Sequence, residues 1–138
     1  MPHDLFPGAH LVTPRLGYRH HGIYAGDGRV IHYGGMHRWL SRRPVEEVSL
    51  ATFTHGRGLA VKAWTSPRFS GREIVARART RLGEDRYRLL SNNCEHFVEW
   101  CIGGRSRSPQ VEAWLAPLHR LAARAQRQRT VVTSLANT

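Results

Sequence analysis

The sequence has no long apolar run, and its first residues lack the features of a signal peptide. No stretch reaches the roughly 18 consecutive apolar residues that a membrane-spanning helix needs. Residues 1–6 carry neither a basic segment nor an apolar segment of the kind found in secretory leaders. These absences predict a cytoplasmic protein whose contact with a membrane, if it makes one, is peripheral.

Cysteine is scarce, because only Cys94 and Cys101 are present. The two lie seven residues apart in what we predict to be one helix. Their Cα atoms would then be about 10 Å apart along the helix axis, which is too far for a disulfide. The spacing of the cysteines and histidines does not match that of a zinc site. We therefore expect two free thiols in a reducing compartment, no metal and no cofactor, with Cys101 in the core.

Lysine is almost absent, since Lys62 is the only one, yet arginine brings the formal net charge to +11. This charge permits attraction to nucleic acid, anionic lipid headgroups or acidic proteins, and it does not choose among them. Genomic base composition would explain the preference for arginine equally well. Aromatic residues make up only 9% of the chain and no nucleic-acid motif is present, which argues against a nucleic-acid partner.

Strand-like patterns fill the first half of the chain and helical patterns fill the second. An Asp-Gly pair at residues 27–28, one of the strongest hairpin signals, divides the longest extended segment. Strands before helices predict an α+β fold, with a small antiparallel sheet or barrel packed against helices. The extended segments are residues 8–13, 18–35, 42–48 and parts of 52–64.

Three helices are predicted after Pro67. Ser70 and Glu73 form a capping box for the first helix, whose apolar positions are Ile74, Val75, Ala78 and Leu82 and which Gly83 ends. The second begins near Cys94 and ends at residues 103–104. The third, at residues 110–127 with a kink near Pro117, is basic and amphipathic. We therefore divide the chain into a domain at residues 1–104 and a helical tail at 105–138.

Cys94 is predicted to lie in the first turn of its helix, with Asn92 as the N-cap and Glu95 completing a capping box. The helix dipole and the unpaired N–H groups there favour a thiolate with a lowered pKa, and they can stabilise an oxyanion. Such a nucleophile needs a histidine as its base. His96 points elsewhere on the helix, so we expect it to pack or form a hydrogen bond beneath the site.

Two segments together resemble the lecithin:retinol acyltransferase family, a circularly permuted branch of the papain-like NlpC superfamily. They are "YRHHGIYAGDGRVIHYGG" (residues 18–35) and a later segment that contains Asn-Cys-Glu-His-Phe (residues 93–97). The resemblance implies that Cys94 is the nucleophile, His20 its base and His32 the residue that orients His20. Tyr18 and Asn93, with His96, are weaker candidates for oxyanion or supporting roles. His21 stands where relatives have other residues, and we leave it out of the triad.

The hairpin poses a geometric problem for this triad. A flat two-residue hairpin centred on residues 27–28 pairs Ile23 with His32, which would place His20 and His32 on opposite faces. A β-bulge or strong coiling of the strands, at Gly22 or Gly26, would bring the two imidazoles to one site.

The resemblance implies a cysteine-dependent acyltransferase or phospholipase-type hydrolase that forms a thioester with a lipid ester. Two alternatives remain open from the residues: a thiol peptidase or amidase of the same superfamily, and a basic binding module for nucleic acid or an acidic protein. Residues 111–127 have the character of a helix that lies on an anionic membrane, packs on the domain core or binds a partner.

Overall fold

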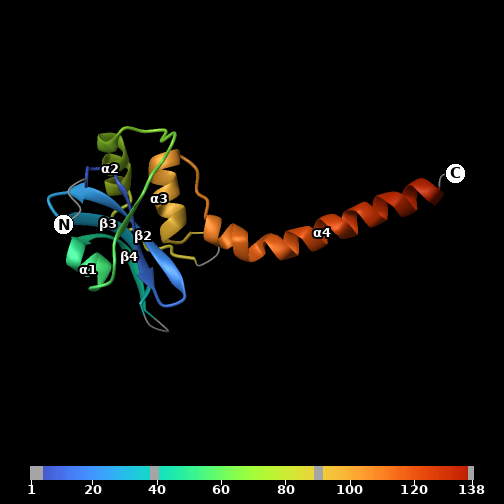
Figure 1. The fold of residues 1–138 in the computed structure, drawn as a ribbon, viewed down its shortest axis with the longest axis horizontal. Coiled ribbons are helices and arrows are strands. Elements are labelled where there is room, and N and C mark those ends of the chain that lie inside the picture. The colour runs from blue at the N-terminus through green and yellow to red at the C-terminus, as the bar shows by residue number, and fades with distance from the viewer. Residues whose placement is uncertain (1–4, 38–40, 89–91, 137–138) are drawn as a thin grey trace. The chain divides into compact units, whose positions relative to one another are not determined.

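The computed structural model describes residues 5–37, 41–88 and 92–136, and it divides into two compact units, Met1–Ser108 and Pro109–Thr138. The first unit contains a five-stranded sheet of order β4-β3-β2-β1-β5 in which neighbouring strands are antiparallel (Figure 1). The sheet confirms the predicted α+β class. Its strands are β1 (His10–Arg15), β2 (Tyr18–Gly26), β3 (Arg29–His37), β4 (Ser41–Ser49) and β5 (Ala60–Lys62).

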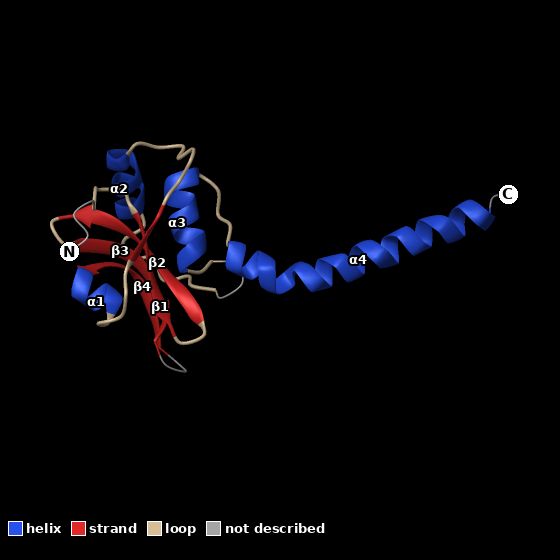
Figure 2. Ribbon diagram, in the orientation of Figure 1, coloured by secondary structure: helices blue, strands red, loops and turns tan. Residues whose placement is uncertain are grey.

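Helices cover both faces of this sheet (Figure 2). On one face, helices α2 (Gly71–Thr80) and α3 (Cys94–Gly103) pack on the alternate residues of β2, β3 and β4. On the other face, α1 (Leu50–Thr54) inserts Phe53 against β1 and β3. The larger cluster contains Ile23, Ile31, Tyr33 and Val45 with Ile74, Val75, Phe97 and Val98, and the smaller one contains Ala9, Leu11, Val30 and Phe53.

The β2–β3 hairpin contains the bulge that the site requires. Asp27 and Gly28 both have positive φ, at 52° and 72°, as a type I′ hairpin turn demands. The register then shifts between Tyr24 and Gly26, so that Gly22 rather than Ile23 lies opposite His32. The irregularity therefore lies at the Gly26 end of the strand and not at Gly22. Because side chains alternate along a strand, this shift puts His20 and His32 on one face.

The helices differ from the sequence prediction in three places. Leu50–Thr54 forms the short helix α1, capped by the Ser49 side chain, in a region where extended structure was expected. Leu82 is 43% exposed and lies beyond α2, so its assignment to the buried stripe is wrong, although the Ser70–Glu73 capping box is confirmed. In the second unit, α4 (Pro109–Ala136) continues through Pro117 and well past the expected end. No helix in the described part of the chain has the length and apolar character of a membrane span.

Candidate active site

Cys94 is the first residue of α3, and Asn93 rather than Asn92 caps the helix. The Asn93 side-chain oxygen accepts hydrogen bonds from the N–H groups of Glu95 at 2.9 Å and His96 at 3.0 Å. The Asn93 N–H in turn donates to Nδ1 of His96 at 3.2 Å. His96 therefore completes the capping box that was assigned to Glu95, and the predicted cap was one residue too early.

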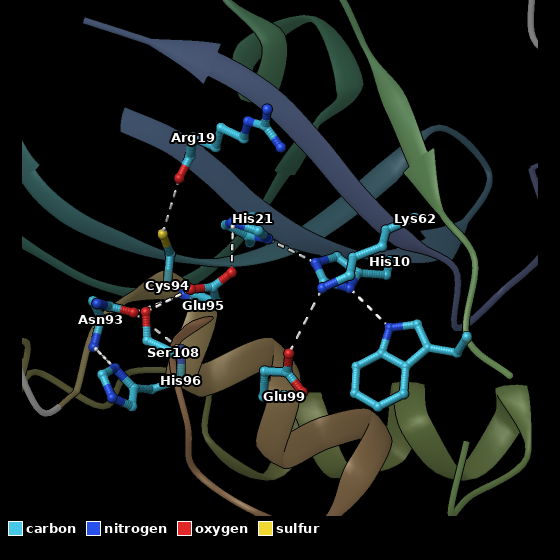
Figure 3. A network of polar contacts seen from close by, with 11 residues as sticks. His10, Arg19, His21, Lys62, Asn93, Cys94, Glu95, His96, Glu99 and Ser108 are labelled. Carbon is cyan, nitrogen blue, oxygen red and sulfur yellow. Dashed lines mark hydrogen bonds and ion pairs between the residues drawn. The ribbon is translucent and has the colours of Figure 1, made fainter. Parts of the chain in front are cut away.

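The Cys94 sulfur lies against an open segment of the β2 edge. The β2–β3 register runs from Gly22 opposite His32 to Gly26 opposite Arg29, whereas residues 18–21 of β2 pair with β1. The Cys94 thiol donates to the carbonyl oxygen of Arg19 at 3.9 Å (Figure 3). The sulfur thus contacts the backbone immediately before His20, at the point where β2 and β3 separate.

His20 and His32 form a relay that ends at a carboxylate. Nε2 of His20 lies 2.6 Å from Nδ1 of His32, and Nε2 of His32 lies 3.1 Å from a carboxylate oxygen of Glu46. Since an ionised carboxylate only accepts, Nε2 of His32 carries the hydrogen and its Nδ1 is an acceptor. Nε2 of His20 then donates, which leaves Nδ1 of His20 unprotonated. The ring of Phe53 packs beneath both imidazoles, with centroid distances of 5.3 and 5.7 Å.

Burial dominates the electrostatics of this site. It raises the pKa of the Cys94 thiol to about 11, although the backbone N–H groups of His21 and Glu95 act in the opposite direction. Burial, followed by the charges of His32 and Arg15, holds the pKa of His20 well below its ordinary value. The resting site therefore contains a thiol and a neutral imidazole. The expectation of a lowered thiol pKa is wrong, because loss of solvation outweighs the effect of the helix terminus.

The remaining predicted residues take different positions. Tyr18 is 38% exposed, and its ring meets His20 edge-on at a centroid distance of 6.4 Å. His96 hydrogen-bonds to the helix cap, as was expected of a residue beneath the site. Cys101 is fully buried in the core, where burial raises its pKa to about 12. Both cysteines are free.

Sequence reasoning missed Glu46. It also missed a second buried network next to Cys94, which is the one drawn in Figure 3. Glu46 lies opposite His32 in the β3–β4 register, so correct strand pairing would have identified it. In the second network, Nε2 of His21 lies 3.4 Å from a carboxylate oxygen of Glu95, and its Nδ1 lies 2.7 Å from Nε2 of His10. No short sequence pattern connects these three residues.

Across the residues that the structure describes, no three histidine, cysteine or carboxylate side chains are grouped as metal ligands.

Comparison with known proteins places this geometry in a family. A family model described as Lecithin retinol acyltransferase matches residues 3–107. Lecithin retinol acyltransferase of Bos taurus is 29% identical over 129 residues, covering 74% of this chain and 56% of that protein. Phospholipase A and acyltransferase 2 of Homo sapiens is 34% identical over 117 residues, covering 73% of this chain and 72% of that protein.

The lecithin retinol acyltransferases are longer than this chain, which spans little more than half of their length. The similarity nevertheless includes both the hairpin with His20 and His32 and the helix that begins at Cys94. The chain belongs to the lecithin retinol acyltransferase family.

Proposed function

We propose that this protein is a cysteine-dependent acyl-transfer enzyme that acts on lipid esters, with Cys94 as nucleophile, His20 as base and His32 as the residue that orients His20. The observation that carries the proposal is the position of the Cys94 sulfur, 3.9 Å from the carbonyl oxygen that precedes His20. The names of the relatives, which are acyltransferases and phospholipase A/acyltransferases, support it.

The hydrogen-bond relay supports Nδ1 as the atom of His20 that acts as the base. Because Nε2 of His20 donates to His32, Nδ1 of His20 bears the available lone pair. His32 and Glu46 then stabilise the imidazolium that forms when His20 accepts a proton, since the carboxylate lies at the end of the relay. Removal of Glu46 would leave His32 free to adopt the other tautomer.

The reaction follows from these protonation states. His20 takes the Cys94 proton as the sulfur attacks the ester carbonyl, so the thiol is not ionised beforehand. The C–S bond forms, the ester C–O bond breaks, and the His20 imidazolium returns its proton to the departing alcohol. Water or an acceptor hydroxyl then attacks the thioester, loses its proton to His20 and regenerates the Cys94 thiol.

Two features are suited to the negative charge of the substrate and of the tetrahedral intermediate. The backbone N–H groups of His21 and Cys94 lie beside the sulfur, where an oxyanion would form, whereas those of Glu95 and His96 donate to the Asn93 side chain. Arg15 donates from Nη2 to the carbonyl oxygen of Phe53 at 2.6 Å, while its buried Nη1 has no partner among the described residues. We assign Arg15 the role of contacting the phosphate or carbonyl oxygen of the substrate.

The same proposal includes a peripheral contact between the basic helix α4 and anionic lipid. Trp114, Leu118 and Leu121 are exposed and recur at helical spacing, with Arg120 and Arg124 between and beyond them. Such a combination is typical of helices that lie in a membrane interface.

Intact-mass measurement after incubation with phosphatidylcholine vesicles tests the function. Wild-type protein should gain the mass of one acyl chain, mapped to Cys94, and Cys94→Ala should gain none. Cys101→Ala is the matched control, because it removes a thiol from the same helix without touching the site, and it should still be acylated. An adduct that persists in Cys94→Ala would exclude the mechanism.

A dipeptide panel in the same assay tests the thiol peptidase or amidase alternative. Release of an amine from the peptides, with no acylation of Cys94 by the vesicles, would favour peptide or amide hydrolysis over acyl transfer from lipid esters. Retardation of nucleic acid by Cys94→Ala, with no turnover by wild-type protein, would favour the binding module.

A further inference from the structure

The second buried network forms a chain of hydrogen bonds whose directions are fixed at one end by a tryptophan. Nε1 of Trp64 donates to Nδ1 of His10 at 2.9 Å, and an indole N–H cannot accept. Nε2 of His10 must therefore carry the hydrogen and donate to Nδ1 of His21 at 2.7 Å. Nε2 of His21 then carries the remaining hydrogen and faces the Glu95 carboxylate at 3.4 Å.

This chain ends at the residue that follows the nucleophile. The other carboxylate oxygen of Glu95 accepts from Oγ of Ser108 at 2.5 Å, and the Glu95 N–H is held by the Asn93 side chain. Both the backbone and the side chain of Glu95 are thus fixed in the first turn of α3. Cys94 lies between the two fixed residues Asn93 and Glu95 (Figure 3).

His21 acts on this turn in two ways. Its side chain faces Glu95, and its backbone N–H is one of the groups directed at the Cys94 sulfur. The side chain of His20, its neighbour on β2, does not point at Glu95 but contacts His32 and Phe53, while the Cys94 sulfur lies at the strand edge between the two side chains. One short segment of strand therefore carries both the base and the contact that fixes the helix bearing the sulfur.

Stability alone does not explain why these groups are buried. His10, His21 and Glu95 are each no more than 3% exposed. Apolar residues of similar volume would commonly stabilise a core as well as a buried polar network does. The network instead fixes the position of the start of α3 relative to the strand β2, because its hydrogen bonds are all satisfied in only one arrangement of the two.

We propose that His21, oriented by His10 and Trp64, is a positioning residue that holds Cys94 at the open edge of β2 through Glu95. The kinetic consequence of this inference rests on the proposed function. The hydrogen-bond geometry of the network can be tested without turnover. A displacement of about 1 Å at a reacting atom can cost about 100-fold in rate. A loss of this contact should therefore appear in the rate of acylation more than in substrate binding.

The kinetic test compares variants that remove or retain the contact. In His21→Leu, the rate of Cys94 acylation should fall about 10- to 100-fold, with little change in the half-saturating lipid concentration. His21→Gln should recover most of this loss, because its amide can donate to Glu95 and accept from His10. Trp64→Phe, which keeps an aromatic ring and removes only the donor, should have an intermediate effect.

The tautomers can be read directly from ¹⁵N–¹H spectra of the histidine rings, whether or not the protein turns over. His10 and His21 should both carry hydrogen on Nε2 in the wild type, and Trp64→Phe should release His10 from this state. An Nδ1–H tautomer at either residue would overturn the proposal, as would a His21→Leu variant that is acylated at the wild-type rate.

The two proposals fail in different ways. Wild-type protein without an acyl adduct would remove the reaction, and the kinetic role of His21 with it. Normal wild-type acylation together with unchanged His21→Leu would remove only the positioning role. If His21→Leu does not fold, the ring spectra and the rates of His21→Gln and Trp64→Phe decide the outcome.

Discussion

Lowering the pH from 7 to 5 should strongly destabilise the Met1–Ser108 unit, because four buried histidines are neutral in the fold. Burial lowers the pKa of His10 to about 2 and lowers the pKa of both His21 and His32 to about 4. It also holds the pKa of His20 well below the ordinary value. None of these residues is more than 6% exposed, so solvent screening does not weaken the effect.

The sign follows from proton uptake. In the unfolded chain histidine has a pKa of about 6.5, so below this pH the unfolded state binds protons that the folded state excludes. The stability that these residues contribute is complete above about pH 6.5 and is lost as the pH falls, toward 4 for His21 and His32 and toward 2 for His10. Each histidine should cost about 2 kcal/mol between pH 7 and pH 5, and the four together about 6–8 kcal/mol. A domain typically has only about 5–15 kcal/mol in total.

Urea unfolding followed by tryptophan fluorescence at several pH values from 7 to 5 measures this effect. Near pH 5 the free energy of unfolding should fall by about 5 kcal/mol per pH unit, since each excluded proton contributes about 1.4 kcal/mol per unit. His21→Gln should reduce this slope by the contribution of one proton, about 1.4 kcal/mol per pH unit. The exposed His119 serves as control, because His119→Gln should leave the slope unchanged.

A slope that corresponds to fewer than two protons would refute the description of these histidines as buried and neutral. The lowered pKa of Glu84, which comes mainly from its hydrogen bond with Arg81, does not affect this window. Stability from that carboxylate is lost only as the pH falls below about 4.5.

Three further changes test the site and its support. The rate at which iodoacetamide modifies Cys94, followed by peptide mass, should rise steadily from pH 6 to pH 10, whereas a plateau near neutrality would show a resting thiolate. Gly22→Ala should destabilise the protein by about 1–3 kcal/mol in urea, because the new Cβ would lie 2.8 Å from the ring of Phe53 beneath the two imidazoles; an unchanged urea midpoint would contradict this packing. Asn93→Ala and Ser70→Ala each remove a helix cap worth about 1 kcal/mol, but only the first should also slow acylation, and equal acylation rates in the two variants would show that the cap at Cys94 has no role in positioning.

The parts of the fold that depend on local sequence were predictable. The Asp-Gly turn fixed the hairpin, and Ser70 with Glu73 fixed the start of α2, because both signals operate within four residues. A departure from the flat hairpin was also predictable, since the flat pairing puts His20 and His32 on opposite faces, and the structure shows that a bulge rather than strong coiling provides it. Its position at the Gly26 end depended on how β2 and β3 pair over their whole length.

The cap of α3 shows why neighbouring signals can be misread. Asn92 and Asn93 are equally good caps, and Glu95 three residues after the first of them favoured Asn92. In the fold, the Glu95 carboxylate is engaged by His21 and Ser108, so it is not available for a capping box. A tertiary contact therefore decided a local choice, and the sequence carries no short pattern for that contact.

The acidity of Cys94 was misjudged for a related reason. Its position at a helix start was correctly inferred, and that position does lower the thiol pKa through neighbouring N–H groups. The extent of burial was not visible in the sequence, and it decides the sign of the total shift. The relay to Glu46 was also missed, because it requires the register of β3 against β4.

The extra residue in the β2–β3 hairpin also constrains how this protein can change by insertion or deletion. Loss of Ala25, the residue at the register shift, would leave Gly22 opposite His32 and keep His20 and His32 on one face. Gain of one residue between Ile23 and Gly26 would instead turn the β2 residues before it over by one position, placing His21 where His20 now lies and moving Ile23 out of the core. Such an insertion would remove the base and the packing in a single event. Inactive descendants that still fold should therefore carry point substitutions at the sulfur or the imidazoles rather than an added residue in β2.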